Sequence, residues 1–415
     1  MHITRFRVEH LFNHFTHDLE LERTHRDGRP SLAIIHGPNG VGKTTILKML
    51  NAMLAGLARG NNRTLDVFFE TPFERCTLWL SGAQPIIVTR TRGATNRRAL
   101  LVEFGGVRAT IERDMPRSVV MRDLEGIGFR QALSEALSEL DFEFVETARI
   151  DRRILENSDQ RRAELRAARA AHRATGDLTE RVANFISQAQ LNFQFFFQSE
   201  EPDLFERIMS RLTSPHPSPT EPSVLLAQLA RIESIDEQAA QFGLARERWS
   251  PERLRELIQR ANQQESPQEH VLAVAAQYLD MLDTRAIERS VITHRLKTFE
   301  SLLAEFLEWK SVRLDPKVGF TITTDEGALL SEDDLSSGEH HLLYLMVSAL
   351  VTRRKGTIVA IDEPEMSMHL SWQRRLVPAL LQVAERAETQ FILTTHSPDM
   401  AAEYWPEMFA IGTSS

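Results

Sequence analysis

The sequence has 415 residues but only one cysteine, Cys76. A single cysteine cannot form an internal disulfide or supply a cysteine-based zinc site, so both are excluded. No apolar run approaches the ~18 residues that a membrane-spanning helix needs, so we expect no membrane association. The N-terminus shows no secretory signal, because residues 2–8 are already patterned as a strand. These absences lead us to expect a cytoplasmic protein.

The sequence also lacks an excess of positive charge. Its 49 Lys and Arg are outnumbered by 58 Asp and Glu, which gives a net charge of −9. A surface of this balance does not by itself attract nucleic acid. One local basic segment, residues 159–173, contains five arginines and a histidine against one glutamate. That segment could contact DNA or a protein partner, but arginines at three- and four-residue spacing are also typical of a solvated helix face.

A phosphate-binding loop is predicted near the N-terminus. Ser31–His36 is an apolar, β-branched run typical of a buried strand, and Thr44–Ala58 has apolar residues at helical spacing. A glycine-rich segment joins the two and extends into the first residues of the helix: Gly37, Pro38, Asn39, Gly40, Val41, Gly42, Lys43, Thr44 and Thr45. Strand, loop and helix are the context that this motif requires. Backbone N–H groups and Lys43 would bind phosphates, and the Thr44 hydroxyl would bind Mg²⁺.

Two later strands are predicted to complete the site. Thr357–Ile361 is followed by Asp362 and Glu363, and Gln390–Thr395 is followed by His396. A carboxylate at the end of such a strand binds Mg²⁺, and a second acid can polarise the attacking water. His396 could donate a hydrogen bond to the γ-phosphate. Alone, the acid pair would indicate a solvated turn and the histidine a structural role, but the upstream loop favours a nucleotide site.

A further motif precedes the helix predicted over His340–Thr352. The segment 335–339, with the sequence LSSGE, resembles the signature motif of ABC-class ATPases. A helix N-terminus with a serine hydroxyl and glycine amides can bind an anion, and the same groups also make an ordinary helix cap. In the ABC class, the signature contacts ATP held by the partner subunit. The resemblance therefore implies that Ser336 and Gly338 act across a homodimer, or a higher homo-oligomer, with ATP between its heads.

The predicted fold class is α/β, a P-loop NTPase head of the ABC type with a mixed core sheet and an antiparallel β meander. A mainly helical insertion interrupts this head. The expected domains are residues 1–150 and 311–415, which build the head, and the insertion 151–310. A hairpin of residues 312–314 and 320–323, with its turn at 325–327, is expected to lead into the signature.

Motif order resembles the ABC-class ATPases related to SMC, RecF and overcoming-lysogenization-defect (OLD) proteins. The segments 307–310, 319–320 and 361–373 (IDEPEMSMHLSWQ) further resemble AAA-type ATPases of bacterial anti-phage defence systems, such as the ATPase subunits of Septu or PARIS. The resemblance implies an ATPase that regulates or scaffolds a separate effector, a nuclease encoded nearby. It also implies which residues bind or hydrolyse ATP with Mg²⁺: Lys43, Thr44, Asp362, Glu363 and His396.

Several alternatives stay open. The residue that serves as the glutamine loop is undecided among Arg149, Gln194 and Gln198. A DNA-repair or recombination ATPase of the RecF or SMC kind would bind DNA and hydrolyse ATP faster in its presence. A transporter subunit is disfavoured by the large helical insertion. A nucleotide sensor would bind ATP and hardly hydrolyse it.

Overall fold

The computed structural model describes the chain apart from residues 22–29, 58–61, 93–97, 113–123, 139, 147–175, 200–205, 207–208, 210–220, 246–249, 264–268, 353–355, 399, 401–403 and 413–415. The chain forms two compact units, residues 1–171 with 335–415 and residues 172–334. The domain limits at 150 and 310 stay predictions. The basic segment 159–173 lies outside the described residues.

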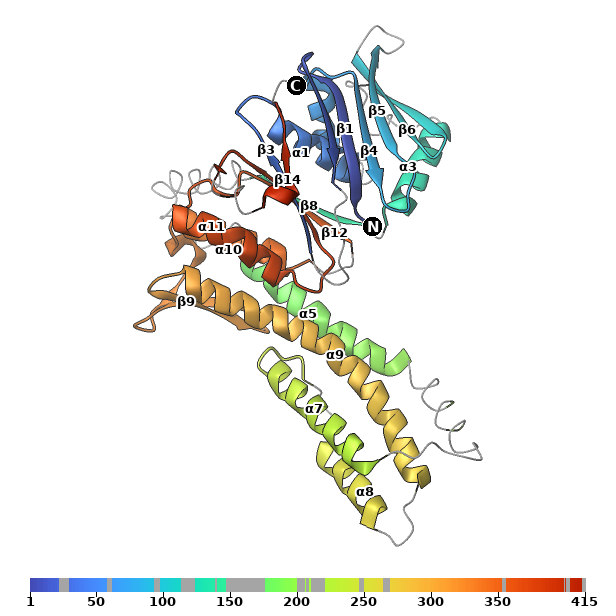
Figure 1. Ribbon diagram of the computed structural model, residues 1–415, viewed down its shortest axis with the longest axis vertical. Coiled ribbons are helices and arrows are strands. Elements are labelled where there is room, and N and C mark those ends of the chain that lie inside the picture. The colour runs from blue at the N-terminus through green and yellow to red at the C-terminus, as the bar shows by residue number, and fades with distance from the viewer. Residues whose placement is uncertain are drawn as a thin grey trace, which may run out of the picture. The chain divides into compact units, whose positions relative to one another are not determined.

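The first unit is built around a parallel sheet (Figure 1). Its strand order is β14-β3-β13-β12-β8. The bounds are β3 Ser31–His36, β8 Asp141–Glu146, β12 Thr357–Asp362, β13 Gln390–Thr395 and β14 Met408–Ala410. All the described pairs in this sheet are parallel, and every residue of β12 and β13 is buried. Strands buried on both faces are continuous apolar runs, which explains why the sequence predicts them well.

A second sheet of the first unit is antiparallel, with strand order β2-β1-β4-β5-β6-β7. Its strands are β1 Ile3–Leu11, β2 Phe15–Glu20, β4 Arg75–Leu80, β5 Ile86–Arg92, β6 Arg98–Phe104 and β7 Val107–Glu112. The predicted meander corresponds to β4–β7. The buried side chain of Gln390 links the two sheets: its Oε1 accepts from the Ile3 N–H at 2.8 Å, and its Nε2 donates to the Ile3 carbonyl at 2.9 Å.

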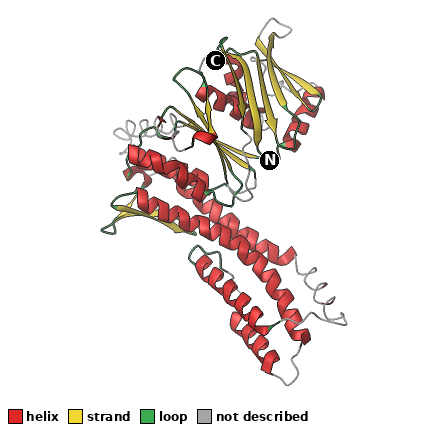
Figure 2. Cartoon of the chain, viewed as in Figure 1, coloured by secondary structure: helices red, strands yellow, loops and turns green. Residues whose placement is uncertain are grey.

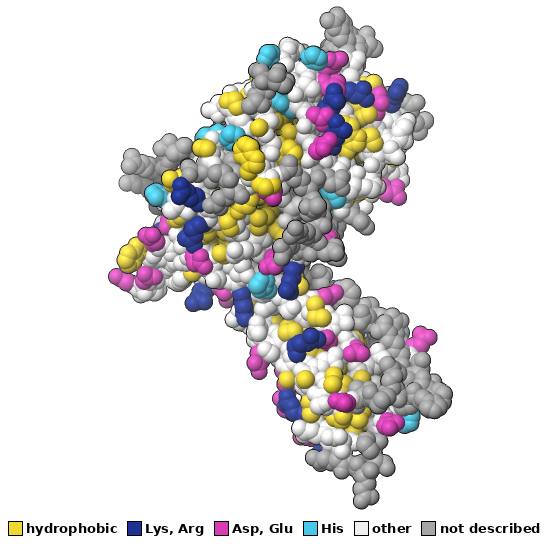
Figure 3. All heavy atoms as spheres, in the orientation of Figure 1, with side chains coloured by type: hydrophobic (Ala, Val, Ile, Leu, Met, Phe, Trp, Pro, Cys, Tyr) yellow, Lys and Arg dark blue, Asp and Glu magenta, His cyan; other side chains and the backbone are white. Residues whose placement is uncertain are grey.

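Helices cover these sheets (Figure 2). They are α1 Lys43–Asn51, α2 Asn62–Glu70, α3 Leu124–Ala136, α10 Ser337–Leu350 and α11 Leu370–Val383. The helix predicted after the loop is present, but it continues as a π-helix over Ala52–Leu57. On the face shown in Figure 3, basic and acidic side chains lie side by side in places. The ion pairs of Arg5 with Asp18 and of Arg7 with Glu9 are formed by residues of β1 and β2.

The second unit is mainly helical. Its helices are α5 Gly176–Ser199, α7 Pro222–Ala240, α8 Pro251–Gln263 and α9 Glu269–Phe306. Apolar residues of α7, α8 and α9 form one core cluster. The C-terminal part of α9 buries four apolar residues at three- and four-residue spacing: Leu296, Phe299, Leu303 and Phe306. None of the helices in the described ranges is both long and apolar enough to cross a membrane.

The hairpin at the end of the second unit corrects one prediction. Its strands are β9 Lys310–Asp315 and β10 Gly319–Thr324, so the chain reverses at residues 316–318 and not at 325–327. The Asp315 carboxylate makes this turn by accepting from the N–H groups of Lys317 and Val318, both at 2.8 Å. The turn at 325–327 instead leads into a short third strand, β11 Leu329–Leu330. Both segments carry turn-forming residues, and the sequence pattern alone does not rank them.

Candidate functional site

The loop between β3 and α1 turns at two glycines. Gly40 and Gly42 have φ angles of 87° and 100°, in the left-handed region that side chains rarely adopt. A Cβ on Gly42 would also lie 2.5 Å from Leu11 Cδ2, and one on Gly37 would lie 2.6 Å from the Ile411 carbonyl oxygen. Leu11 of β1 and Ile411, which follows β14, therefore hold the loop closely. The tip of the loop is exposed, at Pro38, Asn39 and Gly40.

Lys43 lies at the first position of α1 and is only 5% exposed. Its Nζ donates to the carbonyl of Gly37 at 2.7 Å and to that of Pro38 at 3.1 Å. These bonds fold the ammonium group back over the loop. The helix has no side-chain hydrogen bond at its N-cap, Gly42, so its first N–H groups keep their capacity to bind an anion. Thr44 and Thr45 follow and are half-buried.

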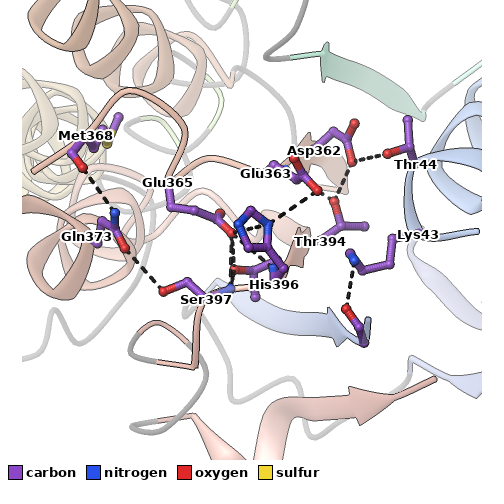
Figure 4. A network of polar contacts seen from close by, with 12 residues as sticks. Lys43, Thr44, Asp362, Glu363, Glu365, Met368, Gln373, Thr394, His396 and Ser397 are labelled. Carbon is purple, nitrogen blue, oxygen red and sulfur yellow. Dashed lines mark hydrogen bonds and ion pairs between the residues drawn. The ribbon is translucent and has the colours of Figure 1, made fainter. Parts of the chain in front are cut away.

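Asp362, the last residue of β12, joins the loop to two strands of the core sheet (Figure 4). Its Oδ1 accepts from the Thr44 hydroxyl at 3.0 Å and from the Thr394 hydroxyl at 2.6 Å. The residue is 6% exposed, and this burial raises the pKa of the Asp362 carboxyl. The two hydroxyl bonds favour its charged form and lower that pKa in part. Thr44 and Asp362, the two residues predicted to bind Mg²⁺, are thus joined by a direct hydrogen bond.

The donor set at this position fits Mg²⁺. Carboxylate and hydroxyl oxygens are hard ligands, and Mg²⁺ is commonly held by one or two protein oxygens together with substrate phosphates and water. Within the described part of the chain, no group of three or more His, Cys, Asp or Glu could hold a metal ion by itself. A cation at Thr44 and Asp362 would therefore depend on the nucleotide for further ligands. That dependence agrees with a site that binds metal and nucleotide together.

Glu363 follows with a strained backbone. Its φ is 48°, uncommon for a residue with a side chain, and its N–H donates to the Thr394 carbonyl at 3.0 Å. Its Oε1 lies 3.5 Å from Nδ1 of His396 (Figure 4). Strain of this kind persists where surrounding contacts enforce it, and it is concentrated at functional sites. The two residues predicted to act on the water and the γ-phosphate therefore lie next to each other.

A third acid, Glu365, lies close to this pair, although the sequence did not predict a role for it in the site. Its Oε1 accepts from the Thr395 hydroxyl and from the N–H groups of His396 and Ser397, at 2.5, 3.1 and 3.3 Å. The Ser397 hydroxyl also donates to Gln373 Oε1 at 3.2 Å, at the start of α11. Glu365 thus ties the turn after β13 to the segment after β12. A third acid close behind Asp362 and Glu363 was the only signal for it in the sequence.

His17 is a second residue that the sequence did not reveal. It lies in β2, is 5% exposed, and its Nε2 is 2.9 Å from the carbonyl oxygen of Val41 in the phosphate loop. A carbonyl can only accept, so Nε2 carries the proton and donates. Burial lowers the pKa of His17, and the bond to Val41 raises it in part. The Phe15 ring stacks on the imidazole at a centroid distance of 5.7 Å, which fixes its plane.

An ion pair adjoins the acidic strand. Lys48 of α1 lies 2.7 Å from Glu146, the last residue of β8. Glu146 is paired with Asp362 across the parallel strands, so both carboxylates lie at one edge of the core sheet. The positive charge of Lys48 also lowers the pKa of Asp362 in part. No sequence pattern connected these residues, because their proximity depends on which strands are neighbours.

The signature segment forms the start of α10. The Ser336 hydroxyl accepts from the N–H of Glu339 at 3.3 Å, and the Glu339 carboxylate accepts from the N–H of Ser336 at 2.7 Å. This capping box shows that the ordinary cap is present, while Ser336 stays exposed. Gly338 is buried, and a Cβ there would lie 2.6 Å from the carbonyl oxygen of Ser367. The role of Ser336 and Gly338 across a dimer stays a prediction.

The glutamine-loop residue stays undecided. Arg149 lies outside the described residues, and Gln194 and Gln198 belong to α5, in a stretch whose side chains are not described. Both glutamines lie in the second compact unit, whereas Asp362 and the phosphate loop lie in the first. Each of the three candidates remains a prediction.

Comparison with known proteins agrees with a P-loop ATPase. A curated relative, the "Retron Ec83 probable ATPase" of Escherichia coli, is 32% identical over 125 residues. That match covers 27% of this chain and 22% of the relative, so the chain spans about a fifth of the relative's length.

Two solved structures are similar at low sequence identity. The Smc head domain with an extended coiled coil from Pyrococcus furiosus, bound to the C-terminal domain of ScpA, has 15% identity and a TM-score of 0.41, covering 97% of this chain and 91% of that one. The Smc head domain with a coiled coil and joint from Pyrococcus yayanosii has 15% identity and a TM-score of 0.38, covering 97% of this chain and 93% of that one.

A family model matches residues 134–399, which include β8, α10 and the strands that carry Asp362 and His396. The phosphate loop lies before the matched residues. Membership in a P-loop ATPase family implies nucleotide binding. Because the match covers more than half of the sequence, the chain belongs to the family described as "AAA domain, putative AbiEii toxin, Type IV TA system".

Proposed function

We propose that the chain binds ATP with Mg²⁺ at the phosphate loop and hydrolyses it to ADP and phosphate. One observation carries this proposal: the Asp362 carboxylate accepts hydrogen bonds from both Thr44 and Thr394. These bonds join the loop, the acidic strand and the strand before His396, which are far apart in sequence. Glu363 and His396 then lie beside the acid, where the γ-phosphate of a loop-bound nucleotide would be reached.

Each residue has a defined part in the proposed reaction. Bound Mg²⁺ supplies positive charge to the phosphates, and Thr44 and Asp362 would hold it. Lys43 and the N–H groups of the loop bind phosphate oxygens and stabilise the charge that develops on them. Glu363 orients the attacking water and accepts its proton, and His396 contacts the γ-phosphate. Catalysis is thus mainly positioning and electrostatic stabilisation.

We further propose that two heads close around ATP. Ser336 is exposed at the N-terminus of α10, and its capping hydroxyl and neighbouring amides could also meet an anion from another subunit. The resemblance of residues 335–339 to the ABC signature supports a homodimer or higher homo-oligomer. Such a dimer would contain two nucleotides, each bound by the phosphate loop of one subunit and the signature of its partner.

The proposed biological role is regulation or scaffolding of a separate effector, a nuclease, in anti-phage defence. Two similarities support it: the family description mentions a type IV toxin–antitoxin system, and the Escherichia coli relative is the probable ATPase of a retron. Co-purification with the product of a neighbouring gene, followed by a nuclease assay of the complex with and without ATP, tests this role. A chain that instead binds DNA directly, with ATP turnover that DNA stimulates and salt suppresses, would favour the RecF-like alternative.

Glu363→Gln tests the catalytic proposal. The amide keeps the size of the side chain but cannot accept the water proton, so turnover should fall by about a hundredfold or more while ATP still binds. Steady-state phosphate release and ATP titration of both proteins measure the two quantities. Wild-type turnover in the variant would remove Glu363 from the reaction. Wild-type protein that binds ATP without releasing phosphate would identify a nucleotide sensor.

A further inference from the structure

The Glu365 carboxylate concentrates its hydrogen bonds on one oxygen. Oε1 accepts from the Thr395 hydroxyl and from two successive backbone N–H groups, those of His396 and Ser397. The Thr395 hydroxyl in turn accepts from the Ser397 N–H at 2.9 Å. One carboxylate oxygen therefore accepts from both backbone donors at the point where β13 ends and the chain turns, and it shares the Ser397 N–H with the Thr395 hydroxyl. Figure 4 shows these contacts meeting at Glu365.

The other oxygen of the same carboxylate is buried but makes no hydrogen bond to the described residues. Oε2 has no hydrogen-bond partner among the described residues, although the side chain is only 4% exposed. A buried acceptor without a partner is destabilising, because it has lost its hydrogen bonds to water and gained none in the protein. A smaller or apolar residue would avoid that cost, but it would leave the His396 N–H without this acceptor and the Ser397 N–H with only the Thr395 hydroxyl. The position therefore favours the turn at the expense of local stability.

The turn carries His396, whose Nδ1 is 3.5 Å from Oε1 of Glu363 and 3.5 Å from Oε1 of Glu365. The imidazole is half exposed, with 50% of its side-chain surface accessible, so packing does not fix it. The two carboxylates and the backbone of the turn determine where the ring lies. We propose that Glu365 is a positioning residue that holds the turn 395–397 and so places His396 beside Glu363. This inference rests on the proposed ATPase function.

The unequal use of the two oxygens permits a sharp experiment. Glu365→Gln keeps an oxygen to accept from the turn and places its NH₂ group where Oε2 has no partner. Glu365→Ala removes the acceptor. Thr395→Val keeps the shape of its side chain but removes the hydroxyl that bonds both Glu365 and the Ser397 N–H. The series separates the hydrogen bonds of Glu365 from its charge.

The measurements are kcat for Mg·ATP, the Kd for ATP, and hydrogen exchange at the amides of His396 and Ser397. Misplacing a reacting group by an ångström can cost about a hundredfold in rate. We expect Glu365→Ala to lower kcat about tenfold to a hundredfold, with Kd within about threefold and faster exchange at both amides. Glu365→Gln should keep kcat within about threefold and keep the protection, and Thr395→Val should lie between them.

Wild-type kcat in Glu365→Ala, or equal losses in the alanine and glutamine variants, would overturn the inference. If Glu365→Ala does not fold, unchanged kcat and amide protection in Thr395→Val would overturn it instead. Absence of turnover in wild-type protein would refute the proposed function but not this inference. Hydrogen exchange at the amides of His396 and Ser397 would then test the positioning role of Glu365. Protection that is lost in Glu365→Ala and kept in Glu365→Gln would support this role. Equal exchange rates in all variants would refute it.

Discussion

The hydroxyl of Thr394 offers a direct test of the contacts around Asp362. Thr394 is fully buried, and its hydroxyl donates to the Asp362 carboxylate at 2.6 Å. Thr394→Val keeps the shape of the side chain and removes this bond. A hydrogen bond to a charged group contributes about 1.5–3 kcal/mol to stability, so the free energy of unfolding should fall by roughly that amount at pH 7. Urea unfolding followed by circular dichroism measures the change.

A matched control lies on the same strand segment. Thr389 immediately precedes β13, is also fully buried, and its hydroxyl has no hydrogen-bond partner among the described residues. Thr389→Val makes the same chemical change without removing a bond, so its effect should be neutral or slightly stabilising. The difference between the two valine variants isolates the bonds of the Thr394 hydroxyl, which donates to Asp362 at 2.6 Å and accepts from the Glu363 N–H at 3.3 Å. Equal stabilities of the two variants, or a larger loss in Thr389→Val, would refute the reasoning.

The effect of pH on the Thr394 variant has a definite sign. Burial raises the pKa of Asp362 above its unfolded value of 3.8, so Asp362 favours the folded state fully below that value. This contribution is lost as the pH rises through the raised pKa. The Thr394 hydroxyl lowers the pKa of Asp362 in the wild-type chain, so its removal raises that pKa further. The penalty of Thr394→Val should therefore be larger at pH 7 than at pH 4.5. A penalty that grows on acidification would contradict this assignment.

Three other variants test the binding groups. Lys43→Ala should weaken Mg·ATP binding by at least about tenfold, since it removes a buried charge from the loop, and unchanged affinity in a titration would argue against the loop. Ser336→Arg should keep ATP binding to a single head but block ATP-dependent dimerisation in light scattering; Ser336→Ala controls for the lost cap, worth about 1 kcal/mol. His17→Phe should raise the Kd for ATP about tenfold and His17→Gln should restore it, whereas equal affinities would show that the bond to Val41 is dispensable.

The sequence predicts the core strands well because their burial leaves a strong pattern. The structure places β3 and β13 at the predicted bounds, Ser31–His36 and Gln390–Thr395. Both are parallel strands between covered faces, so their central residues are apolar or β-branched and the polar residues lie towards the ends. The loop glycines were predictable for a similar reason, since Gly40 and Gly42 adopt backbone angles that other residues avoid.

Residues that act through tertiary contacts were not predictable in this way. His17, Glu365 and Thr394 each bond to an atom on a segment that another part of the chain brings near. No helix or strand periodicity in the sequence links these three residues. Each residue type is also common at solvated or structural positions, so its presence alone indicates no function. The incorrect prediction that residues 325–327 join the two hairpin strands has a related cause. Two turn-forming segments were available, and the side chain of Asp315 decided between them by satisfying two N–H groups.

The phosphate loop shows why the nucleotide site requires both ends of the chain. Val41 is held on one side by His17 of β2, which donates to its carbonyl, and on the other by Gly412, whose added Cβ would lie 2.3 Å from Val41 Cγ1. Leu11 and Ile411 approach the loop in the same way at Gly42 and Gly37. The N–H groups that would bind phosphate are therefore oriented by β1, β2 and the segment after β14. Residues 134–399, which carry the family match, contain the acids and the signature but none of these supports, so the proposed nucleotide site draws on residues before, within and after the matched segment.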